Sequence, residues 1–283
     1  MDHQPSSVPD NTALAIRRVR HPLRARRLVV AAVLELSPHM RRLTLGGDSL
    51  ADLASESFDD HLKLLLPAAG HGELVLPPPG PDGRPDFAAA GLPPPVARDY
   101  TPRRVDHAAR TLEIDFHLHG EGPAARWAAS ARVGDIVHVA GPRGSMVVPA
   151  DLEWQWLIGD EAALPAIARR LEELSKDVDV TVVIETATLD EALPPLDLAG
   201  ARRLLRVARP ATGDAMALAA PLVDAVRALP TPRGRGHAFA ATESRTVRAV
   251  REVLTGHHGL AKGQVRAAAY WQRGAAAHHE NLD

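Results

Sequence analysis

The chain reads Arg98-Asp99-Tyr100-Thr101-Pro102-Arg103 directly after a long proline-rich stretch, and the interpretation of its first half starts from this hexapeptide. Alternate side chains of a strand project to the same face of a sheet. Arg98 and Tyr100 therefore share a face, and Thr101 adds a hydroxyl beside them. A cation, an aromatic ring and a hydroxyl together can bind one flat, electron-poor ligand. The alternative is an ordinary strand with a buried tyrosine and a surface arginine.

A second motif is a turn of small residues that runs into a helix, His119-Gly120-Glu121-Gly122-Pro123-Ala124-Ala125-Arg126-Trp127-Ala128. Backbone N–H groups at a helix start can bind an anion when no bulky side chain blocks its approach. The motif therefore predicts a pyrophosphate site, bound mainly by the backbone of Gly122, Pro123 and Ala124, with Trp127 on the same helix. His119 is either a further phosphate or hydroxyl donor or a capping side chain.

Short alternating segments surround both motifs and favour an antiparallel β-barrel over residues 25–149. Its strands are expected at 28–36, 41–45, 59–66, 112–118 and 136–139, and again from Arg98. The density of proline and glycine between residues 68 and 95 predicts a long surface loop, because proline cannot donate to a sheet ladder. Residues 1–24 are expected to form a mobile segment that is rich in arginine toward its end.

Strand and helix segments alternate after Pro149-Ala150, which predicts an α/β domain over 150–283 with a mostly parallel sheet. Strands are expected at 154–158, 178–184, 204–207, 237–241 and 265–270. Helices are expected around 164–174, at 214–228, where Asp214 is a cap, and at 243–254. The sequence therefore predicts two domains with a boundary near residue 150.

Composition excludes several classes of protein. The 283 residues include 33 lysines and arginines against 35 acidic residues, so no global basic field would attract nucleic acid. There is no cysteine, which excludes disulfides, thiolate metal sites and cysteine nucleophiles. The chain shows no signal pattern and no apolar run of about 18 residues. We expect a cytoplasmic protein without membrane insertion, working as a monomer.

The second domain carries Gly159-Asp160-Glu161-Ala162-Ala163-Leu164-Pro165-Ala166-Ile167 directly after its first strand. A loop at the carboxyl end of such a strand is a docking place for a nicotinamide cofactor. Together with the two earlier motifs, this stretch resembles the siderophore-interacting proteins, relatives of the ferredoxin reductases. The resemblance implies an FAD-binding barrel followed by a nicotinamide-binding domain.

The resemblance also implies roles for individual residues. Tyr100 would pack on the isoalloxazine, Thr101 would bond its polar edge, and Arg98 would approach the FAD phosphates. Trp271, in Tyr270-Trp271-Gln272-Arg273-Gly274, resembles the family's terminal aromatic that shields the flavin, with a core cap as the alternative. Gly159, Asp160 and Glu161 would belong to the nicotinamide loop, or the two acids would cap the helix.

Glu185 ends the second strand of this domain, where a carboxylate often binds the adenosine ribose and disfavours a 2′-phosphate. This position favours NADH over NADPH. Arg202 and Arg203 support the opposite preference.

An anionic iron chelate needs cations, and four basic residues are candidates for binding it: Lys63, Lys262, Arg266 and Arg273. Lys63 is also typical of an edge lysine that prevents aggregation. The histidine pairs at 257–258 and 278–279 do not have the spacing of a metal site, and no metal is expected.

The activity implied by the resemblance is reduction of a ferric siderophore, with electrons from NADH or NADPH carried by FAD. No catalytic side chain is required, because the chemistry belongs to the cofactor. Two alternatives remain. One is a flavin-containing protein that binds siderophores without reducing them. The other is a flavin reductase with a protein acceptor such as ferredoxin.

Overall fold

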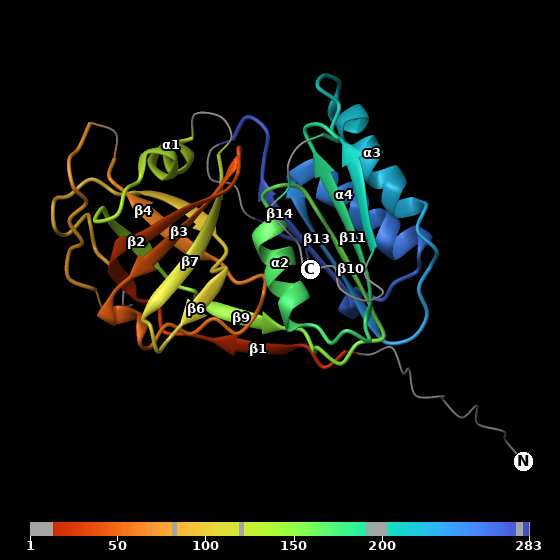
Figure 1. Cartoon of the computed structure of the whole chain (residues 1–283), viewed down its shortest axis with the longest axis horizontal. Coiled ribbons are helices and arrows are strands. Elements are labelled where there is room, and N and C mark those ends of the chain that lie inside the picture. The colour runs from red at the N-terminus through yellow and green to blue at the C-terminus, as the bar shows by residue number, and fades with distance from the viewer. Residues whose placement is uncertain are drawn as a thin grey trace, which may run out of the picture.

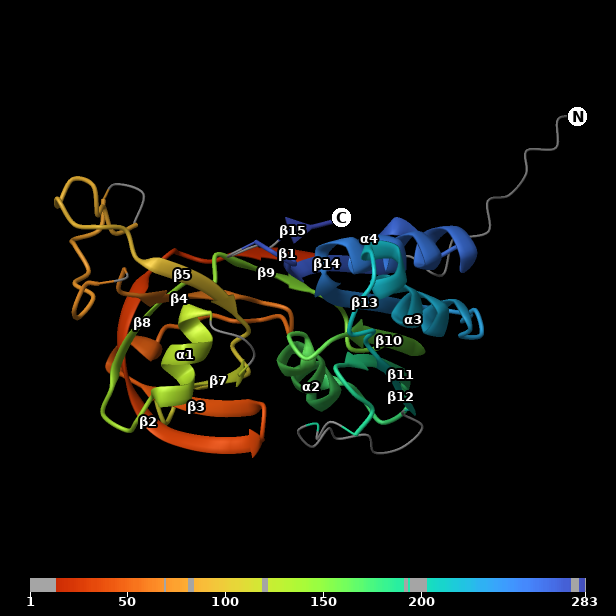
Figure 2. The same cartoon turned by 90° about the horizontal axis from the view of Figure 1, so that it is seen from above.

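The computed structural model describes residues 14–68, 70–80, 84–118, 122–190, 193, 203–275 and 280–282. The chain forms two parts that lie side by side, each built around its own sheet (Figures 1 and 2). The predictions for His119, Arg202 and the histidine pair at 278–279 lie outside the described residues.

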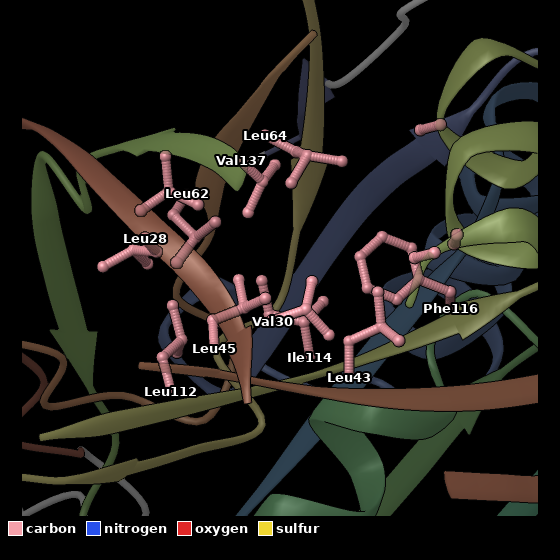
Figure 3. Close-up of a cluster of buried hydrophobic side chains, with 14 of the residues drawn as sticks. Leu28, Val30, Leu43, Leu45, Leu62, Leu64, Leu112, Ile114, Phe116 and Val137 are labelled. Atoms are coloured by element: carbon pink, nitrogen blue, oxygen red, sulfur yellow. The ribbon is translucent and has the colours of Figure 1, made fainter. Parts of the chain in front are cut away.

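A curled antiparallel sheet of seven strands forms the first part, in the order β5-β4-β8-β2-β3-β7-β6. Its strands and α-helix, as far as the residues are described, are β2 (Ala25–Ser37), β3 (Met40–Gly46), β4 (Leu62–Leu66), β5 (Val96–Tyr100), β6 (Arg104–Asp106), β7 (Thr111–His117), α1 (Pro123–Ser130) and β8 (Ile136–Ala140). A 3-10 turn, Asp48–Leu50, follows β3. Alternate residues such as Leu112, Ile114 and Phe116 are fully buried in its core (Figure 3), as their spacing predicts.

A mixed sheet of six strands forms the second part, in the order β12-β11-β10-β13-β14-β15. Its elements are β10 (Trp154–Gly159), α2 (Leu164–Glu173), β11 (Asp179–Thr186), β12 (Arg203–Ala208), α3 (Ala215–Arg227), β13 (Gly236–Glu243), α4 (Ser244–Glu252), β14 (Val265–Trp271) and β15 (Glu280–Asn281). A π-helical turn, Val253–His257, and a 3-10 turn, Lys262–Gln264, lie between α4 and β14. The first five strands pair in parallel, and β15 pairs with β14 antiparallel. Helix α2 covers the face toward the first part, and α3 and α4 cover the other face (Figure 1).

The expected mobile segment at residues 1–24 differs from the structure in one respect. Strand β1 (Arg17–Arg20) pairs antiparallel with β9 (Gly144–Val147) along both parts of the molecule (Figure 1). Backbone hydrogen bonds to β9 order this arginine-rich stretch, and the residues of β1 carry no apolar alternation that would reveal the pairing.

The two parts meet through buried aromatic and charged contacts. Phe58, from the loop before β4, packs edge-on against Phe239 of β13 with ring centroids 5.0 Å apart. The buried guanidinium of Arg266 on β14 donates from Nε to Asp59 at 2.9 Å. Arg169 of α2 donates to the carbonyl of Pro102 at 2.9 Å, directly after the Arg98–Thr101 motif. These contacts fix α2 and β14 against the first sheet.

Among the helices that the structure describes, none has the length and apolar character needed to cross a membrane. The described residues between 68 and 95 carry one isolated bridge, between Pro79 and Pro85, and no strand.

Candidate functional site

A cleft of about 500 Å³ opens between the two parts. The first part contributes the end of β5, Asp115 and His117 of β7, and the start of α1 to its walls. The second part contributes the loop between β10 and α2 and the end of β14. The lining residues used below are Arg98, Tyr100, Thr101, Gly122, Pro123, Glu161 and Trp271.

Tyr100 presents its ring to this cleft from the end of β5. The ring centroid lies 4.4 Å from that of Phe116, and the two planes are tilted by 45°. Burial raises the pKa of the Tyr100 phenol, so the side chain stays neutral at physiological pH. Thr101 is 7% exposed, and its side chain lies next to the phenol of Tyr270 from the second part; burial raises the pKa of that phenol, and Thr101 lowers it to a smaller extent. The hexapeptide therefore reaches both the cleft and the opposite domain.

Among the residues that the structure describes, no side chain caps helix α1 where it begins at the cleft. Gly122 is the N-cap residue and Pro123 follows at the first helical position. A Cβ added at Gly122 would meet no atom within 4 Å, so the space in front of the helix is open. The first N–H groups of a helix have no partner within the helix. These donors are available to an anion in the cleft.

A second cavity, of about 360 Å³, lies at the carboxyl ends of the parallel strands. Glu185, Arg209, Glu243, Arg245 and Arg273 line it, as do the residues around the start of α3. Trp271 lines this cavity and the cleft, so the indole stands between them.

Arg209 lies close to three buried carboxylates and to the ring of Trp271. Its guanidinium lies 2.7 Å from Glu161, 2.7 Å from Glu185 and 4.0 Å from Asp160. The guanidinium carbon also lies 5.9 Å from the centroid of the Trp271 ring, within the range of a cation–π contact. Burial raises the pKa of Asp160 and of Glu185, and their neighbouring carboxylates raise it further.

Asp160 and Glu161 accept further hydrogen bonds besides their contacts with Arg209, whereas Glu185 has one carboxylate oxygen without a partner among the described residues. Asp160 accepts from Nε1 of Trp271 at 2.7 Å and from the hydroxyl of Thr242 at 2.6 Å. Glu161 accepts from the backbone N–H of Ala187 at 3.1 Å. Oε1 of Glu185 is buried and has no hydrogen-bond partner within the described part of the chain.

Several predicted site residues have side chains that line neither cavity. The side chains of Ala124 and Trp127 pack into the core of the first part, although the backbone N–H of Ala124 belongs to the first turn of α1. Gly159 has a packing role. A Cβ on Gly159 would lie 2.5 Å from Cβ of Ala163 and 2.7 Å from the carbonyl of Ala241. The strand can turn into α2 here only without a side chain.

The basic residues predicted to bind a chelate are scattered. Arg266 is buried at the domain interface with Asp59. Lys262 lies just before the start of β14, and Trp271 is at the other end of that strand. Lys63 is half exposed, and its Nζ lies 2.8 Å from Asp99, which lines the cleft. Arg273 lines the second cavity, with its guanidinium carbon 5.9 Å from the Trp271 ring centroid.

Arg209 and Arg245 are site residues that we did not predict from the sequence. Arg209 directly follows β12 and Arg245 lies at the start of α4, so both stand at the carboxyl edge of the parallel sheet. Ligands bind at this edge in open α/β sheets, and that rule is the signal by which both could have been found. Within the described residues, no group of three or more histidines and acids could hold a metal ion.

Two family models match the chain in succession. Residues 29–146 match the siderophore-interacting FAD-binding domain, and residues 152–274 match the siderophore-interacting protein domain. The NADPH-dependent ferric-chelate reductase of Escherichia coli strain K12 is 42% identical over 59% of this chain and 64% of its own length. The ferric vibriobactin reductase ViuB of Vibrio cholerae is 31% identical over 87% of this chain and 89% of its own length.

Solved structures show the same arrangement of both parts. A siderophore utilization protein from T. fusca is 38% identical, with a TM-score of 0.77 over 94% of this chain and 99% of that one. The cytochrome b5 reductase domain of an Ulva prolifera nitrate reductase is 12% identical and shares the fold, with a TM-score of 0.61 over 86% of this chain and 96% of that one. The chain therefore has the two-domain ferredoxin-reductase-like fold and belongs to the siderophore-interacting protein family.

Proposed function

We propose that the protein is an FAD-dependent reductase that passes electrons from NAD(P)H to ferric siderophores and releases the iron as Fe(II). One observation carries this proposal. The Arg98–Thr101 motif of the FAD-binding domain and Trp271 of the second domain line the same cleft, and Trp271 also lines a separate cavity at the sheet edge. A bound flavin and a nicotinamide donor would thus meet at one aromatic residue.

The residues of the cleft fit FAD. The Tyr100 ring supplies a flat surface for the isoalloxazine, and Thr101 lines the same cleft with a hydroxyl that could bond its polar edge. The uncapped start of α1 at Gly122 supplies free N–H donors for the diphosphate. Arg98 lines the same cleft and adds a positive charge for that diphosphate. The curled first sheet would serve as the FAD-binding barrel of this enzyme.

Bound FAD would supply the redox chemistry, which is acceptance of a hydride from the donor and transfer of single electrons to Fe(III); siderophores bind Fe(III) much more tightly than Fe(II). The chain's own residues have to hold and orient these partners. Asp160 fixes Trp271 through the indole N–H, and the contact of Thr101 with Tyr270 joins the two walls of the cleft. No side chain has to act as an acid or a nucleophile.

The second cavity would take the nicotinamide donor. Glu185 has a buried oxygen without a partner at this cavity, and a ribose hydroxyl can donate to it. Glu161 lines the cleft, as Trp271 does, and would lie near the nicotinamide.

Among the basic residues expected to bind a chelate, Lys63 is the best placed for a ferric siderophore. It is half exposed on β4 and pairs with Asp99 at the cleft wall. A ferric chelate carries anionic oxygens, and a nearby ammonium would raise its local concentration.

A single experiment tests the function against its alternatives. The FAD-loaded protein is mixed anaerobically with NADPH or NADH, and then with a ferric siderophore or an oxidised ferredoxin, while the visible flavin absorbance is followed. We expect rapid bleaching by a nicotinamide donor and recovery of the colour with the ferric siderophore. Bleaching followed by recovery only with ferredoxin identifies a protein acceptor. No bleaching by either donor, with tight chelate binding, identifies a non-catalytic binding protein. Gel filtration of the same sample tests the proposed monomer.

A further inference from the structure

The acidic residues of the second cavity are all engaged by hydrogen-bond donors of the protein itself. Oδ1 of Asp214 accepts two backbone N–H groups of the first turn of α3, at 3.0 and 2.9 Å. Oε2 of Glu243 accepts two backbone N–H groups of α4, at 2.7 and 3.2 Å. Both helix starts at this cavity are therefore closed to a ligand, unlike the start of α1.

Glu185 is also compensated, because its Oε2 lies 2.7 Å from Nε of Arg209. The sequence argument for NADH required a carboxylate whose negative charge repels the 2′-phosphate of NADPH. A carboxylate in contact with a guanidinium exerts little such repulsion, because the two opposite charges largely cancel at the distance of a ligand. The acidic residue at the end of β11 thus does not exclude NADPH.

Two arginines at the same cavity have guanidinium N–H donors that no described residue accepts. Arg245, exposed at the start of α4, and Arg273, exposed after β14, both line the cavity. Within the described residues, neither guanidinium forms an ion pair or donates a hydrogen bond. Arg273 only lies near the face of the Trp271 ring. Each guanidinium can donate several parallel N–H bonds, and a phosphate group accepts this geometry.

We propose that Arg245 and Arg273 bind the 2′-phosphate of the nicotinamide donor and make the protein select NADPH over NADH. This inference rests on the proposed function of the second cavity as the donor site. Glu185 keeps the role of a hydroxyl acceptor, through the oxygen that Arg209 does not occupy. The diphosphate bridge of either donor has the same chemistry as a 2′-phosphate, so the test separates the two.

The test uses the FAD-loaded protein and measures binding of 2′,5′-ADP, ADP and 5′-AMP by titration calorimetry. Only 2′,5′-ADP carries the 2′-phosphate, and ADP carries a diphosphate instead. We expect 2′,5′-ADP to bind at least about tenfold more tightly than the other two, since a charged hydrogen bond is worth about 1.5 kcal/mol or more. Arg245→Gln and Arg273→Gln should each remove about tenfold of that affinity and leave 5′-AMP binding unchanged.

The matched control is Arg248→Gln. Arg248 lies on the same helix and pairs with Glu280 at 2.5 Å, and it lines neither cavity. Its loss should leave all three affinities unchanged. Equal binding of 2′,5′-ADP and ADP, or a loss in the variants that is shared by 5′-AMP, would overturn the proposal.

Flavin reduction then distinguishes this inference from the proposed function. Bleaching by NADPH at a rate at least about tenfold above that by NADH, with the ratio reduced in both variants, supports the inference. Equal bleaching by the two donors overturns the NADPH selectivity and leaves the reductase function intact. No bleaching by either donor contradicts the reductase function itself, and the binding titration still decides whether a 2′-phosphate is recognised.

Discussion

The start of α1 and the starts of α3 and α4 face the two cavities of this protein, and they are built in opposite ways. Helix α1 has glycine at its N-cap, and no side chain of the described residues caps it. Helices α3 and α4 are capped by the carboxylates of Asp214 and Glu243. In the first domain, fixed backbone N–H donors at a helix start are open to an anion. In the second domain, carboxylates occupy the donors at the helix starts, and arginine side chains remain to bind an anion.

This difference suits two ligands with different residence times. Backbone donors are already fixed, so a bound diphosphate orders little that was free, and the complex can be long-lived. Exposed arginines must be ordered on binding, which costs side-chain entropy and favours exchange. We therefore expect FAD to stay bound through many turnovers, while the nicotinamide donor enters and leaves.

The largest expected effect concerns the charge cluster of the second domain. Arg209→Met leaves Asp160, Glu161 and Glu185 buried without their cation, and should lower the free energy of unfolding by about 3–5 kcal/mol at neutral pH. Urea unfolding measures the change. The control is Arg203→Met at the start of β12, the strand that Arg209 follows. Arg203 and its partner Asp179 are both more than half exposed. That variant should lose less than about 1 kcal/mol.

The loss in Arg209→Met should depend on pH with a defined sign. Burial raises the pKa of Asp160 and Glu185 in the folded state, and removal of Arg209 raises both values further. The folded variant then binds protons more tightly than the unfolded chain does. Its deficit should be full above the raised pKa values and should shrink as the pH falls through them. A deficit that does not change with pH would show that the lost stability comes from packing and not from charge.

The next effect concerns the first domain, where the ligand is held by a ring and by the backbone. Tyr100→Ala should weaken FAD binding by about tenfold to a hundredfold, because stacking on an aromatic ring contributes on the order of 1–3 kcal/mol. Equilibrium dialysis followed by flavin absorbance measures it. Tyr100→Phe keeps the ring and should bind FAD like the parent. If Tyr100→Ala retains its flavin, Tyr100 does not belong to the site.

The sequence predicted most strands of both domains, because alternation and buried runs are local signals. The strand expected at 112–118 appears as Thr111–His117, with Leu112, Ile114 and Phe116 in the core. Asp214 likewise caps the helix that was expected to begin there. These features depend on residues close in sequence, so the pattern alone identifies them.

The features that the sequence did not predict depend on distant partners. Strand β1 is ordered by β9, and Arg266, expected to bind a chelate, is buried against Asp59 from the other domain. Nothing in the residues around Arg266 indicates that a carboxylate 207 positions away will neutralise it. The residues around Arg209 likewise do not indicate its carboxylate partners, which lie at the carboxyl ends of β10 and β11.

A smaller effect is expected from making α1 resemble α3. Gly122 has φ −60° and ψ 143°, which any residue can adopt, and open space in front of it. Gly122→Asp would cap the helix and place a negative charge before the FAD diphosphate, so we expect about tenfold weaker FAD binding with no loss of apoprotein stability. Gly122→Ala adds a Cβ without a cap and should bind FAD like the parent. Unchanged FAD affinity in Gly122→Asp would mean that the diphosphate does not lie at this helix start.

The smallest effect concerns Lys63 at the rim of the first domain. Lys63→Ala should raise the apparent KM for an anionic ferric siderophore by about twofold to fivefold and leave flavin reduction by NADPH unchanged, because a half-exposed charge contributes about 1 kcal/mol or less. The effect should shrink at high salt.

Lys63 pairs with Asp99 at 2.8 Å, so it could act on the chelate directly or only by neutralising that carboxylate. Asp99→Asn separates the two. If Lys63 attracts the chelate itself, Lys63→Ala keeps its full effect in the Asp99→Asn background. If Lys63 only neutralises Asp99, the double variant has the KM of Asp99→Asn alone. A change confined to solubility or to Tm in every background would assign Lys63 to protection of the sheet edge and leave the first domain with no charged side chain of its own for the chelate among those predicted.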